Sequence, residues 1–549
     1  MSLLDIIAPR LSARRARARL EVAALRERLS LLNESIALSR SYRNSAYSSS
    51  GMGATYDAAK KTRTEADWKS RMTAADSDIE SDATTIINRA RAASRDDSLG
   101  VSIADGWVRN VVGTGIAARA AAQDAATDAP LTEWNVWADW HWKRWTEDPL
   151  QCDVEGHKSF LDFQALAVRE MIVAGQTLIV FSYRPSAENV GLQLQLIEPE
   201  QLNLSLFRWA ETGNDIVRGV ELDEYGKAVA YHFYPKGHPL TTYRGSLTDS
   251  IRVEAARVCH IFRQDRARQS SGMSRFAPVL RELWHKKMYK QYTMIRARME
   301  ACLGAAIESP DASPDADLRG VLDANTPVGS AQTDGRGTSE LTWEPGMIWS
   351  LPNGKKATFY APQSPGGMYD PFTRIQSREI AAGAGLDYPT VTRDYSGNSF
   401  SGQRQGMIEM WKETEPETLR IINHLCRPAW ERFVKLCVLE RRHGMADPPN
   451  WADPIQRAYY LKADFVPPPR PWIDPANQAA AAKMMLEMKL DTFKRLCLEL
   501  NGSRWSDNLE DAAEVKNYAA RSDVGVTLPF EAADPKVAPA EPKPRESLP

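Results

Sequence analysis

The chain has 549 residues, 43% of them hydrophobic, which is enough for about two to four domains with real cores. Its 69 basic and 71 acidic residues leave a net charge of −2, which excludes attraction to nucleic acid or to an acidic membrane by bulk charge alone. Since no apolar run approaches the roughly 18 residues of a membrane span, and the stretch at 3–7 is too short for a signal peptide, we expect a cytosolic chain without membrane contact.

Residues 1–53 predict a basic helix followed by a flexible linker. The stretch at 10–33 intersperses leucines with seven arginines on helical spacing, and residues 41–53 are rich in Ser, Tyr, Gly and Asn. The basic helix is either a docking element or a solvated terminal helix without a fixed partner, and nothing in the pattern names a ligand.

Residues 54–272 predict a compact α+β body. A helical pattern at 79–107 leads into Val111-Val112-Gly113-Thr114-Gly115. We interpret this stretch as a strand ending in a tight turn, because the third glycine and the acidic ribose contact of a dinucleotide-binding turn are missing. A helix is expected at 160–174, strands at 177–183 and 258–262, and a hairpin that turns near 223–226.

Five tryptophans lie close together at positions that partly share a helical face. They are Trp134, Trp137, Trp140, Trp142 and Trp145. Large amphipathic rings of this kind usually cap a core or fill an interface between subunits, and we favour that interpretation over base stacking.

Apolar residues at spacings of three and four run through residues 273–303 and predict a helix about 45 Å long. Such a helix is longer than a small domain is wide, so it must leave the body. The Pro-, Gly- and Asp-rich stretch at 304–369 then predicts a small β-rich insertion with strands near 341–343, 347–349 and 357–360. A second helix returns within residues 370–390 and stops near Gly385.

A polar loop at 391–402 has no apolar period, and its residues are of the kind that a loop presents outside a core. A helix begins near Gln403, and a further helix is expected from Thr414 as N-cap, with a kink at Pro428, within residues 403–466. Residues 467–525 predict a stiff Pro-rich connector followed by helices, and residues 526–549 a disordered tail. From pattern alone, the polar loop is an ordinary helix-loop-helix connection.

The sequence indicates no catalytic site, cofactor or metal centre. The six cysteines are scattered and are interpreted as buried thiols, and a site built from the distant His260, His285 and His424 is not favoured. The acidic residues at 76–82 are typical of a solvated segment rather than of a magnesium site.

Seven segments make the chain resemble the lambda-type portal proteins of tailed bacteriophages and prophages. The resemblance runs from about Ala54 to Asp511, and the segments occur in the same order as in that family. They are ATYDAAK from Ala54, VRNVVGTGI from Val108, FLDFQALAVREMIVAGQTLIVF from Phe160, IEPEQL from Ile197, VCHIFRQDRARQSSGMSRFAPVL from Val258, IAAGAGLDYPTVTRDYSGNSFSGQRQ from Ile380 and FVPPPRPWIDP from Phe465. Each segment is weak alone, but seven in order make the resemblance specific. It does not extend to the first 40 residues or to the tail after Pro529.

The resemblance implies an α+β portal fold. In that fold residues 54–272 are an α/β wing, 273–303 a stem helix, 304–369 a small β-rich clip, and 370–390 the returning stem helix. Residues 391–402 are the tunnel loop, 403–466 the loop-supporting helix and wing return, and 467–525 a mostly helical crown.

The resemblance also implies function and partners. Members of this family form a homo-oligomeric ring of about twelve subunits at a capsid vertex of the virion, assembled in the host cytoplasm, through which double-stranded DNA is packaged and ejected. The implied partners are that DNA, the terminase, a head-completion or adaptor protein and the major capsid protein.

On this resemblance the DNA-facing residues of the tunnel loop are Thr392, Arg393, Asp394, Tyr395, Ser396, Asn398 and Ser399. We expect Arg393 to touch phosphate, Tyr395 and Asn398 to make neutral contacts, and Asp394 to limit adhesion so that DNA still slides.

Two other classes of function compete with this interpretation. One is a magnesium-dependent nuclease or an ATPase of the packaging machinery, against which the chain lacks a GxxxxGK[ST] phosphate loop. The other is a scaffold or capsid-interior protein that does not close into a ring.

Overall fold

A computed structural model describes residues 73–185, 190–204, 206, 208–209, 213–235, 250–307, 332–333, 339–340, 347–350, 369–397, 399–440, 451–470, 474–503 and 505–521. The chain divides into two compact units. The larger unit contains the described residues up to Thr114 and those from Ala120 to Lys462, and the smaller one contains residues 115–119 and those from Ala463 onward.

Helices α3 (Ala75–Asp96) and α4 (Ser98–Val111) open the larger unit. The Asp97 side chain separates them because it accepts the N–H groups of Leu99 and Gly100 at 2.9 and 3.0 Å and so caps α4. Helix α4 packs against α3, α7, α11 and α12, and its Trp107 is fully buried. The strand expected near Val111 is therefore wrong, because the apolar residues there lie on one buried face of α4; the turn itself is present, with positive φ at Gly113 and Gly115.

A three-stranded antiparallel sheet forms the centre of this unit, in the order β3-β2-β9. Its strands are β2 (Gln176–Tyr183), β3 (Leu192–Ile197) and β9 (Val258–Phe262), which confirms the two strands predicted there. Helix α7 (Phe160–Val173) packs on β2 and β9 and begins with a capping box, in which the Ser159 side chain accepts from the N–H of Asp162 while the Asp162 carboxylate accepts from the N–H of Ser159. The predicted helix at 160–174 is confirmed.

A five-stranded antiparallel sheet follows, ordered by sequence as β4-β5-β6-β7-β8. It comprises β4 (Arg208–Trp209), β5 (Asp215–Val217), β6 (Val220–Leu222), β7 (Ala228–Phe233) and β8 (Ile251–Glu254), with the short helices η3 (Pro199–Gln201) and η4 (Ala255–Arg257) beside it. The hairpin predicted near 223–226 joins β6 to β7. One apolar cluster, which includes Leu178, Val220 and Phe233, joins the two sheets.

Ring contacts join α5 (Thr132–Glu147) to α7, to α13 (Arg427–Leu439) and to α14 (Pro454–Tyr460). The short helix α6 (Pro149–Cys152) packs on α5 and β3. The Trp142 ring lies 5.0 Å from Trp145 and 5.2 Å from Trp430, measured between centroids, and both Trp145 and Trp430 are fully buried. The core interpretation of the tryptophans is confirmed for Trp134, Trp142 and Trp145, whereas Trp140 is 58% exposed.

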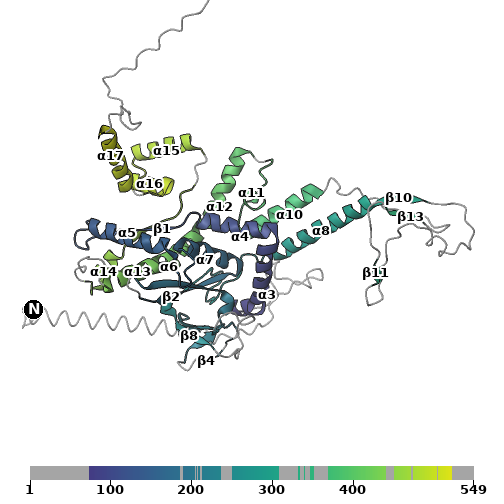
Figure 1. The fold of residues 1–549 in the computed structure, drawn as a ribbon, viewed down its shortest axis with the longest axis horizontal. Coiled ribbons are helices and arrows are strands. Elements are labelled where there is room, and N and C mark those ends of the chain that lie inside the picture. The colour runs from purple at the N-terminus through teal and green to yellow at the C-terminus, as the bar shows by residue number, and fades with distance from the viewer. Residues whose placement is uncertain are drawn as a thin grey trace, which may run out of the picture. The chain divides into compact units, whose positions relative to one another are not determined.

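Two helices, α8 (Leu280–Cys302) and α10 (Tyr369–Ala384), run side by side as an arm of this unit (Figure 1). Tyr289 of α8 contacts Tyr369 and Phe372 of α10, and Lys286 donates to the hydroxyl of Ser377. Helix α8 begins seven residues later than predicted, because Phe276 is buried in the body and Pro278 occupies the preceding turn. Its 23 residues span about 34 Å.

Two small pairs of strands follow α8 in the chain. β10 (Leu303–Ile307) pairs in parallel with β13 (Met347–Ser350), and β11 (Gln332–Thr333) pairs with β12 (Ser339–Glu340). The strand predicted at 347–349 is confirmed, while those predicted at 341–343 and 357–360 lie outside the described residues.

The chain returns through α11 (Tyr388–Thr392), α12 (Phe400–Ile421) and the π-helical turn η5 (Ile422–Cys426) into α13. The predicted helix start at Thr414 is wrong: α12 continues through Pro416, and the Thr414 hydroxyl donates to the carbonyl of Trp411 instead of accepting as a cap. The π turn lies just before Pro428, whose ring would clash with the carbonyl of residue 424 in a regular α-helix.

The smaller unit pairs β1 (Ala117–Ala120) with β14 (Ala463–Val466). It then forms the helices α15 (Pro475–Glu487), α16 (Phe493–Asn501) and α17 (Trp505–Arg521), which confirms the helical region predicted there. Among the described residues of the whole chain, no helix is both long and apolar enough to cross a membrane.

Candidate functional site

Residues 393–399, which we call the α11–α12 loop, contain most of the predicted site. The chain leaves α11 at Arg393, whose φ of 60° is left-handed and whose N–H donates to the carbonyl of Pro389 at 2.8 Å. Glycine usually occupies such a helix end, since another L residue pays about 1–2 kcal/mol there. Arg393 is exposed, so an arginine is present at a position where glycine would be more stable.

Asp394 is the hydrogen-bonding centre of the loop. Its Oδ1 accepts from the N–H of Ser396 at 3.0 Å and from the hydroxyl of Ser396 at 2.5 Å, and its Oδ2 accepts from the hydroxyl of Tyr388 at 2.8 Å. The Ser396 hydroxyl and amide, followed by Tyr388, lower the pKa of Asp394 to about 2. The carboxylate is therefore ionised at any physiological pH, and both of its oxygens have protein partners.

Two arginines one turn apart on α10 complete the surroundings of Asp394. The Arg374 Nη2 lies 3.8 Å from Asp394 Oδ2, and its Nε lies 3.0 Å from Asp370. The Arg378 guanidinium lies 5.4 Å from the centroid of the Tyr388 ring, within reach of a cation–π contact. The loop is thus joined to α10 by the charged contact of Arg374 and to α11 by the hydrogen bond from Tyr388.

The remaining predicted residues divide into inward-facing and exposed groups. The Thr392 hydroxyl donates to the carbonyl of Tyr388 at 2.8 Å, and the Ser399 hydroxyl accepts from the N–H of Gly402 at 3.2 Å and caps α12. The Tyr395 side chain is 61% exposed. With Arg393, it is the strongest candidate for contact with a macromolecule, while Asn398 lies outside the described residues.

Sequence reasoning missed three residues that hold the loop: Arg374, Arg378 and Tyr388. The spacing of the two arginines by four was a visible signal, because it places both on one face of the expected helix. Nothing in the pattern showed that this face meets Asp394, since the contact depends on the turn between α10 and α11.

A junction around Arg275 joins the helices on either side of the loop. Arg275 makes an ion pair with Glu413 of α12, and its guanidinium lies 4.9 Å from the ring centroid of Trp107 on α4. Gly385 (φ 74°) ends α10 beside these groups, where a Cβ would stand 2.6 Å from the Arg275 side chain. The same junction therefore fixes α4, α10 and α12.

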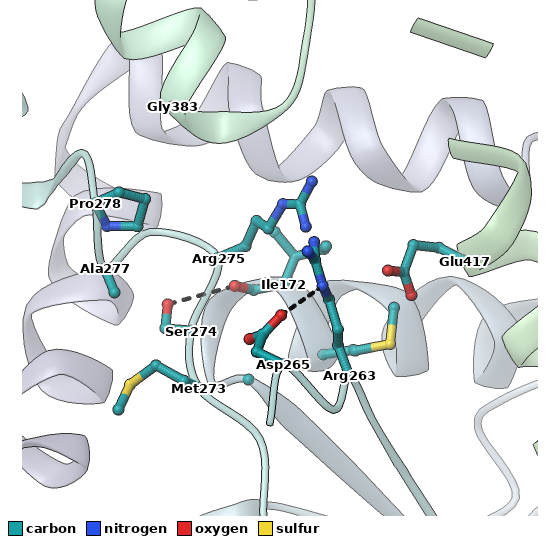
Figure 2. A pocket seen from close by; sticks show the side chains of 12 residues that line it. Ile172, Arg263, Asp265, Met273, Ser274, Arg275, Ala277, Pro278, Gly383 and Glu417 are labelled. Carbon is teal, nitrogen blue, oxygen red and sulfur yellow. Dashed lines mark hydrogen bonds and ion pairs between the residues drawn. The ribbon is translucent and has the colours of Figure 1, made fainter. Parts of the chain in front are cut away.

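A cavity of about 380 Å³ lies next to this junction, among α7, α10, α12 and residues 263–278. Figure 2 shows the side chains of Arg263, Arg275 and Glu417 turned toward it. These charges have partners: Arg263 pairs with Asp265 at 2.8 Å, and Glu417 pairs with Arg420 at 2.8 Å. The cavity thus has a nearly balanced lining with no spare charge to select an ion.

The described residues contain no group of three or more His, Cys, Asp or Glu side chains placed to hold a metal ion. The acidic residues at the start of α3 have protein partners instead: Asp76 accepts from the N–H of Ser270 at 2.9 Å, and Asp78 pairs with Arg266 at 2.9 Å. The prediction of buried thiols is confirmed for Cys152, Cys259, Cys426, Cys437 and Cys497. Burial raises the pKa of Cys259 to about 12.

Comparison with known proteins identifies a family and relatives. The model of a family described as "Phage portal protein, lambda family" matches residues 61–417. The "Probable portal protein" of Halomonas phage phiHAP-1 is 27% identical over 451 residues, which are 80% of this chain and 82% of that protein. "Portal protein B" of Escherichia phage lambda is 19% identical over 408 residues, 71% of this chain and 75% of that protein.

Solved structures with detectable likeness include the "Virion of native gene transfer agent (GTA) particle", at 11% identity and a TM-score of 0.38. The alignment covers 76% of the present chain and 92% of the matched chain of that particle. The "Neck of native GTA particle computed with C12 symmetry" has the same identity and a TM-score of 0.37, over 76% of this chain and 93% of that one. The residues matched by the family model include α8, α10 and the whole α11–α12 loop, whereas α15, α16 and α17 lie beyond them.

Proposed function

Because the chain belongs to the lambda family of phage portal proteins, we propose that its copies close into a ring around double-stranded DNA and that the α11–α12 loop faces this DNA. A portal protein is a connector and not an enzyme, so the nuclease and ATPase alternatives fall away. What has to be explained is passage: how a ring holds or guides DNA without reading its sequence.

The observation that carries this placement of the loop is the exposure of Arg393, together with its conformation. A left-handed arginine at a helix end costs stability that a glycine would restore. Its side chain is exposed, and the neighbouring Tyr395 is 61% exposed. The left-handed φ alone does not set Arg393 apart, because the exposed Arg268 shares it. What supports the loop is that an exposed arginine and an exposed tyrosine lie two residues apart in it, and phosphate is the partner that an arginine matches best.

Repetition in a ring strengthens such contacts. If about twelve subunits each present one Arg393, contacts that are individually weak add up around the axis. They hold DNA by its backbone and therefore independently of sequence. Because each copy supplies only one such arginine, the total attraction between the ring and DNA stays weak enough for DNA to move.

We assign the ring interface to the arm of α8 and α10. Trp284, Met288 and Ile295 recur on the side of α8 that is turned away from Tyr289, the residue that contacts α10. In the single chain, Trp284 is 58% exposed and Ile295 is 41% exposed, and Ile375 on α10 is 53% exposed. Exposed apolar rings and branched residues on adjacent helices favour burial against a second copy.

The remaining parts of the chain take the family roles. We assign residues 54–272 to the wing, α8 and α10 to the stem, 304–368 to the clip, the α11–α12 loop to the tunnel loop, residues 400–466, which begin with α12, to the loop-supporting helix and wing return, and 467–525 to the crown. In this scheme the clip docks the terminase and later the head-completion or adaptor protein, and the ring sits at a capsid vertex of the virion among major capsid proteins.

Negative-stain imaging of the purified full-length chain tests the ring, and annular particles are the expected result. The loop is tested with Arg393→Gly, which removes the charge and also relieves the left-handed strain, so DNA retention should fall while stability holds or rises. Arg268→Gly is the matched control, because Arg268 is another exposed arginine with a left-handed φ, of 64°. Rings that retain DNA equally in both variants would refute the loop assignment.

A further inference from the structure

Asp394 is bound to neighbouring protein groups instead of facing solvent as a free surface charge, and we call it the anchor of the loop. Its side chain is 29% exposed, and its two oxygens accept three hydrogen bonds, from Tyr388 and Ser396. A carboxylate in this state is turned toward the protein, and its field on the channel side is partly offset by Arg374.

These contacts determine the shape of the loop between its two exposed residues. The bond from the Ser396 N–H to Oδ1 closes a tight turn around Tyr395, and Gln403 of α12 donates to the carbonyl of Tyr395 at 3.3 Å. Arg393 precedes the anchor directly and Tyr395 follows it. The directions of both side chains therefore depend on Asp394.

The anchor also links the loop to the arm. Tyr388 and Arg374 connect Asp394 to α11 and α10, and α10 is held to α8 through Ser377 and Tyr369. A displacement of α10 can thus reach the loop through the charged contact of Arg374 with Asp394, and through the contact of Arg378 with the Tyr388 ring, in addition to the backbone.

We propose that Asp394 is a positioning residue: it holds the α11–α12 loop against α11 through Tyr388 and against α10 through Arg374, so that Arg393 and Tyr395 point outward. This inference rests on the proposed function in one respect, which is that the outward side chains meet DNA. It replaces the expectation from sequence that Asp394 weakens adhesion by repelling phosphate.

The two roles predict effects of opposite sign for Asp394→Asn. If Asp394 repels phosphate, neutralising it strengthens DNA binding, because one negative charge per copy is removed. If Asp394 positions the loop, the same change weakens DNA binding. Asparagine keeps one acceptor oxygen for Ser396, but its NH2 group cannot accept from Tyr388 and its side chain no longer attracts Arg374, so Arg393 is held less firmly.

The experiment measures binding of assembled rings to a short DNA duplex of mixed sequence at several salt concentrations. We expect Asp394→Asn to lower affinity by about tenfold and Tyr388→Phe by about threefold, since the latter removes one of the three hydrogen bonds. Asp370→Asn is the control, because it removes the other carboxylate partner of Arg374 without touching the loop, and it should bind as the unaltered ring does. Equal or tighter binding by Asp394→Asn would overturn the proposal.

A double-variant comparison shows whether Asp394 acts through Arg393. If it does, Asp394→Asn has little further effect on affinity when Arg393 is already alanine, whereas a general loss of folding would add to the first change. Full additivity of the two changes would therefore count against positioning.

Hydrogen exchange separates this inference from the proposed function. If Arg393→Ala leaves DNA binding unchanged, the DNA-facing role of the loop is wrong, but the anchor remains testable. Asp394→Asn must then still accelerate amide exchange at Ser396, with the exchange of buried α4 amides unchanged. Protection of Ser396 that is the same in the variant and in the original chain would overturn the anchor itself.

Discussion

The indole Nε1 of Trp107 donates a hydrogen bond to the carbonyl oxygen of Ala384 at 2.9 Å, and this bond ties α4 to the last turn of α10. Both residues are fully buried, and the guanidinium of Arg275 lies over the indole ring. The carbonyl belongs to the end of a helix, where backbone acceptors lack partners within the helix. The body and the arm are thus joined at a point where the loss of one donor leaves a buried acceptor unsatisfied.

We predict that Trp107→Phe lowers the free energy of unfolding by about 2–4 kcal/mol, because the Ala384 carbonyl loses its partner and the smaller ring leaves a cavity in the core. Urea unfolding followed by circular dichroism measures this. Trp140→Phe is the control, since Trp140 is 58% exposed and its replacement should stay within about 0.5 kcal/mol of the original chain. Equal effects of the two changes would show that the bond to Ala384 contributes nothing.

Gly175 offers a second test, of backbone contact between β2 and the segment before α8. Its φ is 89°, and a Cβ there would lie 2.4 Å from the backbone carbon of Met273. We predict that Gly175→Ala costs at least about 3 kcal/mol, because strain and a backbone clash add together. Gly213→Ala has a similar φ of 82° with no heavy atom within 4 Å of the added Cβ, so it should cost only about 1 kcal/mol. Thermal unfolding of both variants separates the clash from the strain.

Local pattern predicted those elements whose own residue types and spacing indicate them. The branched run of β2 and the capped apolar face of α7 are examples, and both were placed to within a residue or two. The errors arose where a distant partner decided the outcome. Thr414 has the residue type of an N-cap, yet it is 2% exposed inside α12, because that helix is packed along α4.

The loop shows the same limit within the candidate site. Its exposure and its polar character followed from sequence, because no apolar period could bury it. The separation of its residues into an inward anchor and outward contacts did not follow, since Asp394 meets Arg374 only after the turn at Gly385 brings α11 and the loop next to α10. The sequence showed that a carboxylate is present at position 394, but only the fold showed that its side chain is directed toward protein partners.

His260 gives a prediction about acid stability. Desolvation, with a smaller contribution from His424, lowers the pKa of His260 from 6.5 to about 3, and its Nε2 lies 3.1 Å from Gln176 Oε1. Because the folded pKa lies below the unfolded one, this contribution to stability is present above pH 6.5 and is lost as the pH falls toward 3. His260→Gln should therefore lose stability less steeply between pH 6.5 and 4 than the original chain.

Denaturant midpoints at several pH values measure this slope. His285→Gln, on the exposed face of α8, serves as the control for removing one histidine. An unchanged slope in His260→Gln would mean that other groups account for the acid sensitivity.

The exposed stripe of α8 allows assembly to be separated from folding. Trp284 is 58% exposed in the single chain, so Trp284→Glu should change the free energy of unfolding by no more than about 0.5 kcal/mol. In the proposed ring the same position is buried against a second copy, where an unpaired carboxylate is costly. We therefore predict folded chains that no longer form annular particles, as judged by light scattering and negative-stain imaging. Val136→Glu is the matched control, because Val136 on α5 is 66% exposed and lies outside the arm. Rings that assemble normally with Trp284→Glu would place the subunit interface on another face of the chain.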